Sequence, residues 1–188
     1  MIDPNRNRVY NGRERHTHAR PDNFGYPCRA VRTEKYLYVR NFKPERWPAG
    51  NPPTDEILNS KSESRGEGYY DIDESPTKTY MINNKKKYED LFDAAFAKRP
   101  VEELYNILID PECLHNLADN KDMQEIKNQL SNELEEVLTE QGDPRMLGYG
   151  DIFESYPRFM RMRQFPGFKE QGKYNSKYEI SKLNTKLR

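Results

Sequence analysis

The sequence is short of apolar residues. Hydrophobic residues make up 34% of the 188 positions even with tyrosine counted, whereas a self-sufficient globular domain carries about 45–50%. No stretch approaches the roughly 18 consecutive apolar residues of a membrane span, and no apolar segment near Met1 resembles a signal peptide. Two cysteines do not make a disulfide framework. This composition predicts an α+β chain with a small core, of the kind that forms part of something larger.

The chain has no net charge, but its charges are segregated. Residues 1–46 hold 11 Lys and Arg against 5 Asp and Glu, residues 102–143 hold 2 against 12, and residues 144–188 hold 10 against 4. The basic ends could form an anion-facing surface, and ordinary solvated faces are an equally good explanation. The balanced total and the acidic block argue against a nucleic-acid partner, and no membrane partner is expected.

Short strands and helix signals predict the fold class. Strands are expected at residues 29–33 and 36–42, where β-branched and aromatic residues gather. Only Glu34-Lys35 separates them, so an antiparallel hairpin is the simplest connection, although Glu-Lys is not a favoured turn pair. A third strand is expected at 102–108. The first twenty-seven residues are rich in Pro, Gly and Asn, which indicates a loop.

Two helical regions are expected. Ser75 and Pro76 have the residue types of an N-cap and a first helical position, and this region ends before Pro100 with Lys85 to Lys87 exposed or interrupting it. Apolar residues then recur at steps of three and four between Met123 and Leu138, which predicts a long helix lying on the sheet.

Five segments in order resemble the C-terminal part of a type I sulfatase. They are Gly-Tyr-Pro-Cys-Arg-Ala-Val-Arg-Thr at 25–33, Tyr-Leu-Tyr-Val-Arg-Asn at 36–41, Glu-Glu-Leu-Tyr-Asn-Ile-Leu-Ile-Asp-Pro at 102–111, Asn-Leu-Ala at 116–118, and Thr-Glu-Gln-Gly-Asp-Pro at 139–144. The Gly-Arg-Glu-Arg-His opening at 12–16 is similar to the heparan N-sulfatase, or sulfamidase, branch.

The resemblance implies a small antiparallel sheet of about four strands with a long helix packed on it. Its implied divisions are a basic linker at 1–27, the sulfatase-like subdomain at 28–144 and a basic aromatic tail at 145–188. The fourth strand is expected near residues 69–72.

The resemblance also implies a hydrolase of sulfate esters or sulfamates on sulfated glycans such as heparan-type sugars. Its formylglycine nucleophile and calcium ion are expected in an N-terminal catalytic domain, and the chain supplies no catalytic residue or metal ligand of its own. The chain would then be inactive alone, would need that sulfatase catalytic domain as its partner, and would act outside the cytoplasm, in the periplasm or as a secreted enzyme.

Some residues imitate the family's catalytic motifs. Cys28 stands four residues before Arg32, which is the spacing of the formylglycine motif, but Ala30 replaces its proline; a small residue at a strand start is the expected role of Cys28. Asp22-Asn23 resembles a calcium pair, but an Asx turn is favoured. The acidic run at 71–74 is expected to precede a helix N-terminus rather than to bind calcium.

A basic loop holds the candidate substrate-binding residues, which are Arg13, Arg15, His16 and His18. Arg and protonated His suit sulfate and carboxylate groups through charge-assisted hydrogen bonds. His16 and His18 lack a third nearby ligand for zinc. The alternatives are a solvated linker for this loop, and a stand-alone module for sulfated or acidic polysaccharides for the chain as a whole.

Overall fold

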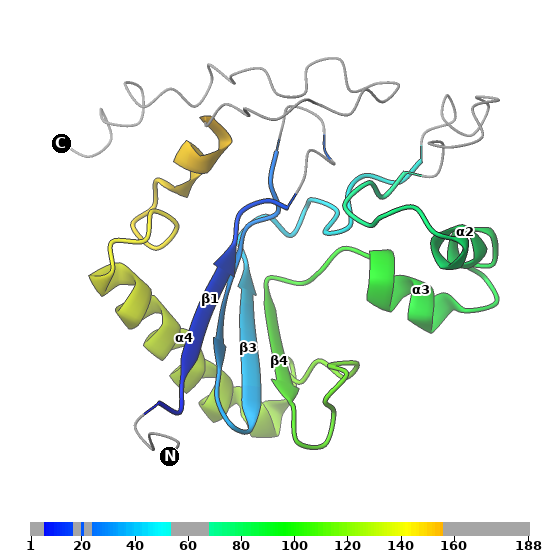
Figure 1. Cartoon of the computed structure of the whole chain (residues 1–188). Coiled ribbons are helices and arrows are strands. Elements are labelled where there is room, and N and C mark those ends of the chain that lie inside the picture. Colours follow the sequence, from blue (N-terminus) through cyan, green and yellow to red (C-terminus); the bar gives the residue numbers. More distant parts are fainter. Residues whose placement is uncertain (1–5, 17–19, 21–23, 54–67, 156–188) are drawn as a thin grey trace. The chain divides into compact units, whose positions relative to one another are not determined.

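The computed structural model describes residues 6–16, 20, 24–53 and 68–155. The chain divides into two compact units (Figure 1). The sheet unit consists of residues up to Glu14, 27–44 and 100–150, and the helix-pair unit consists of residues 15–26, 45–99 and those from Asp151 onward. The boundaries expected at residues 27 and 144 stay predictions.

The sheet unit contains an antiparallel sheet of four strands in the order β1-β2-β3-β4 (Figure 1). The strands are β1 Val9–Arg13, β2 Cys28–Arg32, β3 Tyr36–Asn41 and β4 Glu102–Asn106. This confirms the predicted sheet, the hairpin between β2 and β3, and the strand after residue 101.

The hairpin turn depends on Thr33. Its backbone nitrogen donates to the Tyr36 carbonyl at 2.8 Å, and its hydroxyl oxygen accepts from the backbone nitrogens of Tyr36 at 2.8 Å and Lys35 at 3.1 Å. A threonine hydroxyl can take the place of a backbone group in a tight turn. The turn therefore forms although Glu-Lys is not a favoured turn pair.

The fourth strand is not where the sequence placed it. Residues 9–13 were expected to be loop but form β1, which pairs with β2 from Val9 opposite Arg32 to Arg13 opposite Cys28. Residues 69–72 were expected to be a strand but form a turn, in which the Ile72 nitrogen donates to the Tyr69 carbonyl. Four of the five β1 residues are exposed, so its sequence shows no alternation of buried and exposed positions.

The long helix α4, Gln124–Glu140, packs on the sheet as predicted. A short 3-10 turn, Lys121–Met123, leads into it, and the Asn120 side chain caps that turn. Gly142, with φ of 74°, follows its end. The core of the unit joins sheet and helix side chains: Val31, Tyr38, Leu104, Ala118, Leu130, Leu134 and Leu138. Burying each leucine contributes about 1.5–3 kcal/mol.

The helix-pair unit contains α2, Pro76–Asn83, and α3, Glu89–Phe96. Ser75 caps α2 as predicted, since its hydroxyl accepts from the Lys78 nitrogen at 3.2 Å. Aromatic side chains form the core of the unit, where Tyr69, Phe92 and Phe96 lie with ring centroids 4.7 to 6.1 Å apart. Within the described ranges, no helix has the length and apolar character needed to cross a membrane.

Candidate functional site

Asp71 organises the basic loop in the helix-pair unit. The Asp71 side chain is only 4% exposed. One oxygen of its carboxylate lies 3.0 Å from His16 Nδ1, and the other lies 3.1 Å from Arg20 Nη2. Backbone hydrogen bonds hold this segment, because the Asp71 nitrogen donates to the Ala49 carbonyl at 3.0 Å and the Tyr69 nitrogen donates to that of Asn51 at 2.7 Å. The sequence predicted only an acidic turn here.

Arg20 anchors the carboxylate from the buried side. Its Nε donates to the Trp47 carbonyl at 2.8 Å and its Nη2 donates to that of Pro48 at 2.6 Å. Its side chain is 2% exposed. Hydrogen bonds to two backbone carbonyls and to the carboxylate hold the Arg20 guanidinium in place. Asp71 is therefore a fixed support for the more exposed partner, His16.

His16 presents an imidazole to solvent. Its side chain is 67% exposed, although its Nδ1 is held by Asp71. A carboxylate partner selects the tautomer with the proton on Nδ1, so the second ring nitrogen is left to accept a proton or, once protonated, to donate to an anion. This arrangement can bind a sulfate or carboxylate oxygen in a defined direction.

Arg15 lies in the same unit but is held by internal acceptors. Its Nη2 donates to the Phe153 carbonyl at 2.5 Å and lies 3.9 Å from a carboxylate oxygen of Glu154. Glu154 is 1% exposed and also accepts from Arg46 at 2.6 Å and from the Gly25 nitrogen at 3.1 Å. These contacts within the unit therefore occupy much of the hydrogen-bonding and ion-pairing capacity of the Arg15 guanidinium.

The four predicted substrate-binding residues do not form one described cluster. Arg15 and His16 belong to the helix-pair unit, whereas Arg13 is the exposed last residue of β1 in the sheet unit. His18 lies outside the described residues. A role in substrate binding stays a prediction for all four.

A buried charge network in the sheet unit supports the end of β1. Arg29 Nη2 lies 2.7 Å from Glu14, and Arg29 Nε lies 2.6 Å from Asp143. Arg145 Nη2 reaches the other Glu14 oxygen at 2.7 Å. Burial would raise the pKa of Asp143, but hydrogen bonds from the Arg29 side chain and the Arg145 backbone outweigh it and lower that pKa. The network fixes Glu14, the residue that follows Arg13 at the end of β1.

Among the residues that imitate catalytic motifs, Cys28 has the surroundings of a residue with a structural role. Cys28 begins β2 and is half-buried, and this burial raises the pKa of its thiol, which disfavours the reactive thiolate. Asp22 and Asn23 lie outside the described residues. In the part of the chain that is described, no three His, Cys, Asp or Glu side chains gather in a way that could hold a metal ion.

Comparison with known proteins connects the chain to sulfatases. No family model matches the sequence. Two proteins described as ulvan-active sulfatases, both from Formosa agariphila, are similar to it. One is 28% identical over 118 residues, which is 63% of this chain and 18% of that protein. The other is 29% identical over 154 residues, which is 76% of this chain and 22% of that protein.

The chain thus has a distant sulfatase relationship, and it spans about a fifth of the length of the curated relatives it matches. The similarity does not by itself assign a sulfatase type, a substrate or a catalytic group to this chain.

Proposed function

We propose that the chain is the C-terminal, substrate-facing portion of a sulfatase that acts on a sulfated glycan. The relationship to two sulfatases and the sheet with its packed helix support this assignment. The catalytic nucleophile, a formylglycine, and its calcium ion would be supplied by a sulfatase catalytic domain, which is the expected partner. The chain alone would release no sulfate, and the assembled enzyme would act in the periplasm or as a secreted protein.

The role of the chain in that enzyme is to bind the sugar through His16. The carrying observation is the exposed imidazole fixed to the buried Asp71. A protonated imidazole favours an anionic group, and its fixed orientation lowers the entropy lost when a sulfated sugar binds. Arg13 and His18 stay predicted substrate contacts, and Arg15 would hold the part of the loop that belongs to the helix-pair unit in place.

The finer substrate assignment rests on separate arguments. The opening at residues 12–16 resembles the heparan N-sulfatase branch, which favours a type I enzyme that acts on heparan-type sugars. The matched relatives are named for activity on ulvan. Sulfated glycan is the substrate class common to both.

A titration of the full chain with a sulfated monosaccharide tests this function. Glucosamine 6-sulfate and N-sulfoglucosamine are the probes, unsulfated glucosamine is the comparison, and the ring nitrogens of the three histidines are followed by NMR. We expect both sulfated sugars, and not glucosamine, to shift the His16 signals.

His115 is a matched internal control. It is 79% exposed and lies 3.5 Å from Asp110, so it is also an exposed histidine beside a carboxylate. His16→Asn assigns the His16 signals, and a shift confined to those signals that persists in His115→Asn supports the proposal. Equal shifts at both histidines, or none at either, would overturn it.

A further inference from the structure

Three consecutive lysines form the turn between α2 and α3 (Figure 1). Lys85, Lys86 and Lys87 are all exposed. None of their ammonium groups forms an ion pair with a carboxylate in the described part of the chain. Their charges are therefore available to an external anion.

The turn is held in a defined conformation. Asn84 closes α2, because its side-chain nitrogen donates to the Tyr80 carbonyl at 2.8 Å and its backbone nitrogen donates to the same oxygen at 3.1 Å. The Asn84 carbonyl then accepts from the backbone nitrogens of Lys87 at 2.9 Å and Tyr88 at 3.2 Å. The lysines thus extend from an ordered backbone, which reduces the entropy lost on binding.

Two tyrosines flank the lysine turn. The hydroxyl oxygens of Tyr80 and Tyr88 lie 3.2 Å apart, and their rings are tilted by 43° with centroids separated by 5.8 Å. Tyr80 is 50% exposed. The Lys87 ammonium lies 5.0 Å from the Tyr88 ring centroid, so a cation and an aromatic face meet at one place.

We propose that this surface, the Lys–Tyr patch (Tyr80, Lys85, Lys86, Lys87 and Tyr88), binds a stretch of sulfated polysaccharide. The lysines suit the sulfate groups, while tyrosine rings offer apolar faces with polar edges to the C–H faces and hydroxyls of sugar rings. The inference rests on the proposed function for its ligand class, but the patch shares no residue with the His16–Asp71 pair.

The surroundings favour a sulfated polysaccharide over a nucleic acid. Glu89 and Asp90 are exposed in the first turn of α3, directly after the patch, so the basic surface is short. The tilted, hydroxyl-linked tyrosines do not offer two parallel faces between which a base could stack. A short basic surface suits weak attachment to a flexible polymer whose sulfates recur along the chain.

Attachment at this patch would raise the local concentration of the next sulfate group. A polymer held at two places on one protein binds more tightly than either contact alone allows. The patch would therefore affect long substrates and leave monosaccharides unaffected.

Binding of dextran sulfate to the full chain tests the proposal. The variant Lys85→Gln, Lys86→Gln, Lys87→Gln removes the three charges from exposed positions, so its folding is expected to be unchanged. Its affinity for dextran sulfate should fall about tenfold, as three exposed ion pairs of ordinary strength would give. The dependence of its affinity on salt should also become less steep, because fewer counterions are released.

A second triple variant is the matched control. Lys35→Gln, Lys98→Gln, Lys121→Gln removes the same charge from exposed positions elsewhere and should change the affinity less than twofold. Equal losses in both variants, or no binding of dextran sulfate by the unaltered chain, would overturn the proposal. If the unaltered chain bound a DNA duplex with equal affinity, and the variant at Lys85, Lys86 and Lys87 lost that affinity in the same way, the assignment of the patch to sulfated sugars would be overturned.

The outcome is separable from that of the proposed function. His16→Asn should lower dextran sulfate affinity less than the triple lysine variant does, because it leaves the Lys–Tyr patch intact and removes only one contact of the polymer. If the triple lysine variant kept its affinity for dextran sulfate while the monosaccharides still shifted the His16 signals, the patch alone would be rejected. The reverse result would reject the His16 contact and keep the patch.

Discussion

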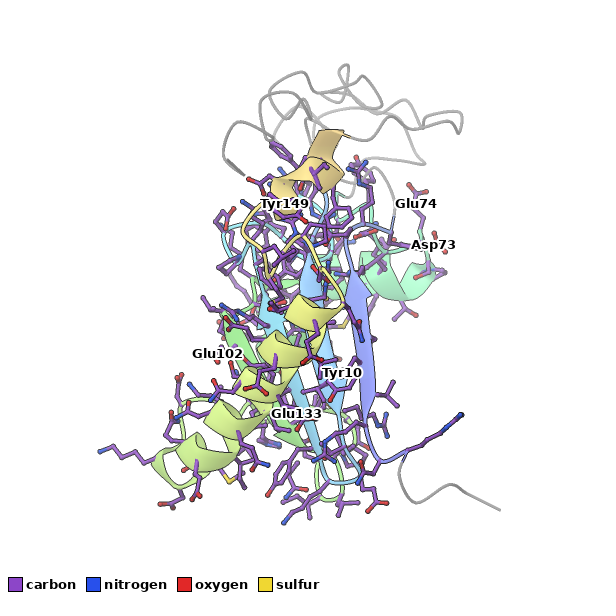
Figure 2. The ribbon with its side chains drawn as sticks, turned by 90° about the vertical axis from the view of Figure 1, so that its left-hand side faces the viewer. Tyr10, Asp73, Glu74, Glu102, Glu133 and Tyr149 are labelled. Carbon is purple, nitrogen blue, oxygen red and sulfur yellow. The ribbon has the colours of Figure 1, made fainter. Side chains whose placement is uncertain are left out.

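The Tyr10 hydroxyl donates a hydrogen bond of 2.6 Å to Glu133 and so joins the edge strand β1 to the helix α4 (Figure 2). Arg8 reaches the same carboxylate oxygen at 2.9 Å. Tyr10 is the one β1 residue that is partly buried rather than exposed. This contact explains why β1 pairs with the sheet although its sequence gives little strand signal.

Tyr10→Phe should remove the part of the folding stability that the unaltered chain loses at alkaline pH. Burial, followed by the hydrogen bond to Glu133, raises the pKa of Tyr10 to about 12 from its ordinary 10.0. The stabilising contribution is therefore complete below pH 10 and is lost as the pH rises through about 12. Chemical denaturation at pH 8 and at pH 11.5–12 should show a difference between Tyr10→Phe and the unaltered chain that narrows at the higher pH.

Tyr38 must be separated from this effect, because burial also raises its pKa. It remains in both proteins, so it cancels in the comparison. A constant difference between the two proteins across the whole range would contradict the assigned role of Tyr10.

Gly12→Ala should destabilise the sheet unit by about 1–3 kcal/mol, the usual cost of overpacking. A Cβ at Gly12 would stand 2.7 Å from Arg29 Cδ. The Arg29 side chain cannot move aside freely, because Glu14 and Asp143 both bind its guanidinium. The shift of the urea midpoint measures this cost. The neighbouring exposed position supplies the control, since Asn11→Ala should stay within about 0.5 kcal/mol.

Asp143→Asn should make the folding stability depend less on pH in the acid range. Despite burial, which opposes the change, hydrogen bonds from Arg29 and Arg145 lower the pKa of Asp143 below its ordinary 3.8. A lowered folded-state pKa gives stability that is present above the ordinary value and is lost as the pH falls through the lower one. Unfolding measured between pH 2 and pH 5 should therefore be less pH-dependent in the variant, and identical acid limbs would contradict this account.

Local signals predicted the elements that depend on neighbouring residues. Ser75 caps α2 through a contact three residues away, and the spacing of Leu130, Leu134 and Leu138 placed the long helix on the sheet. These features depend on short-range geometry and on one apolar stripe, both of which the sequence displays directly.

Long-range contacts account for what the sequence did not predict. The strand β1 depends on its register with β2 and on Tyr10 reaching Glu133. The site depends on Asp71, which lies 55 positions from His16. No periodicity connects such distant residues, so the basic loop could be recognised while the carboxylate that orients its histidine could not.

Asp71→Asn should weaken the contacts that Asp71 makes with Arg20 and His16. The asparagine keeps the shape of the side chain but loses the charge that binds both Arg20 and His16, so stability should fall by about 1.5–3 kcal/mol, the usual contribution of a hydrogen bond to a charged group. The His16 ring would lose its fixed orientation, and the shifts induced by a sulfated monosaccharide should weaken severalfold. Asp110→Asn, beside the exposed His115, is the control and should leave those shifts unchanged. Undiminished shifts in a folded Asp71→Asn protein would show that His16 binds anions without its carboxylate partner.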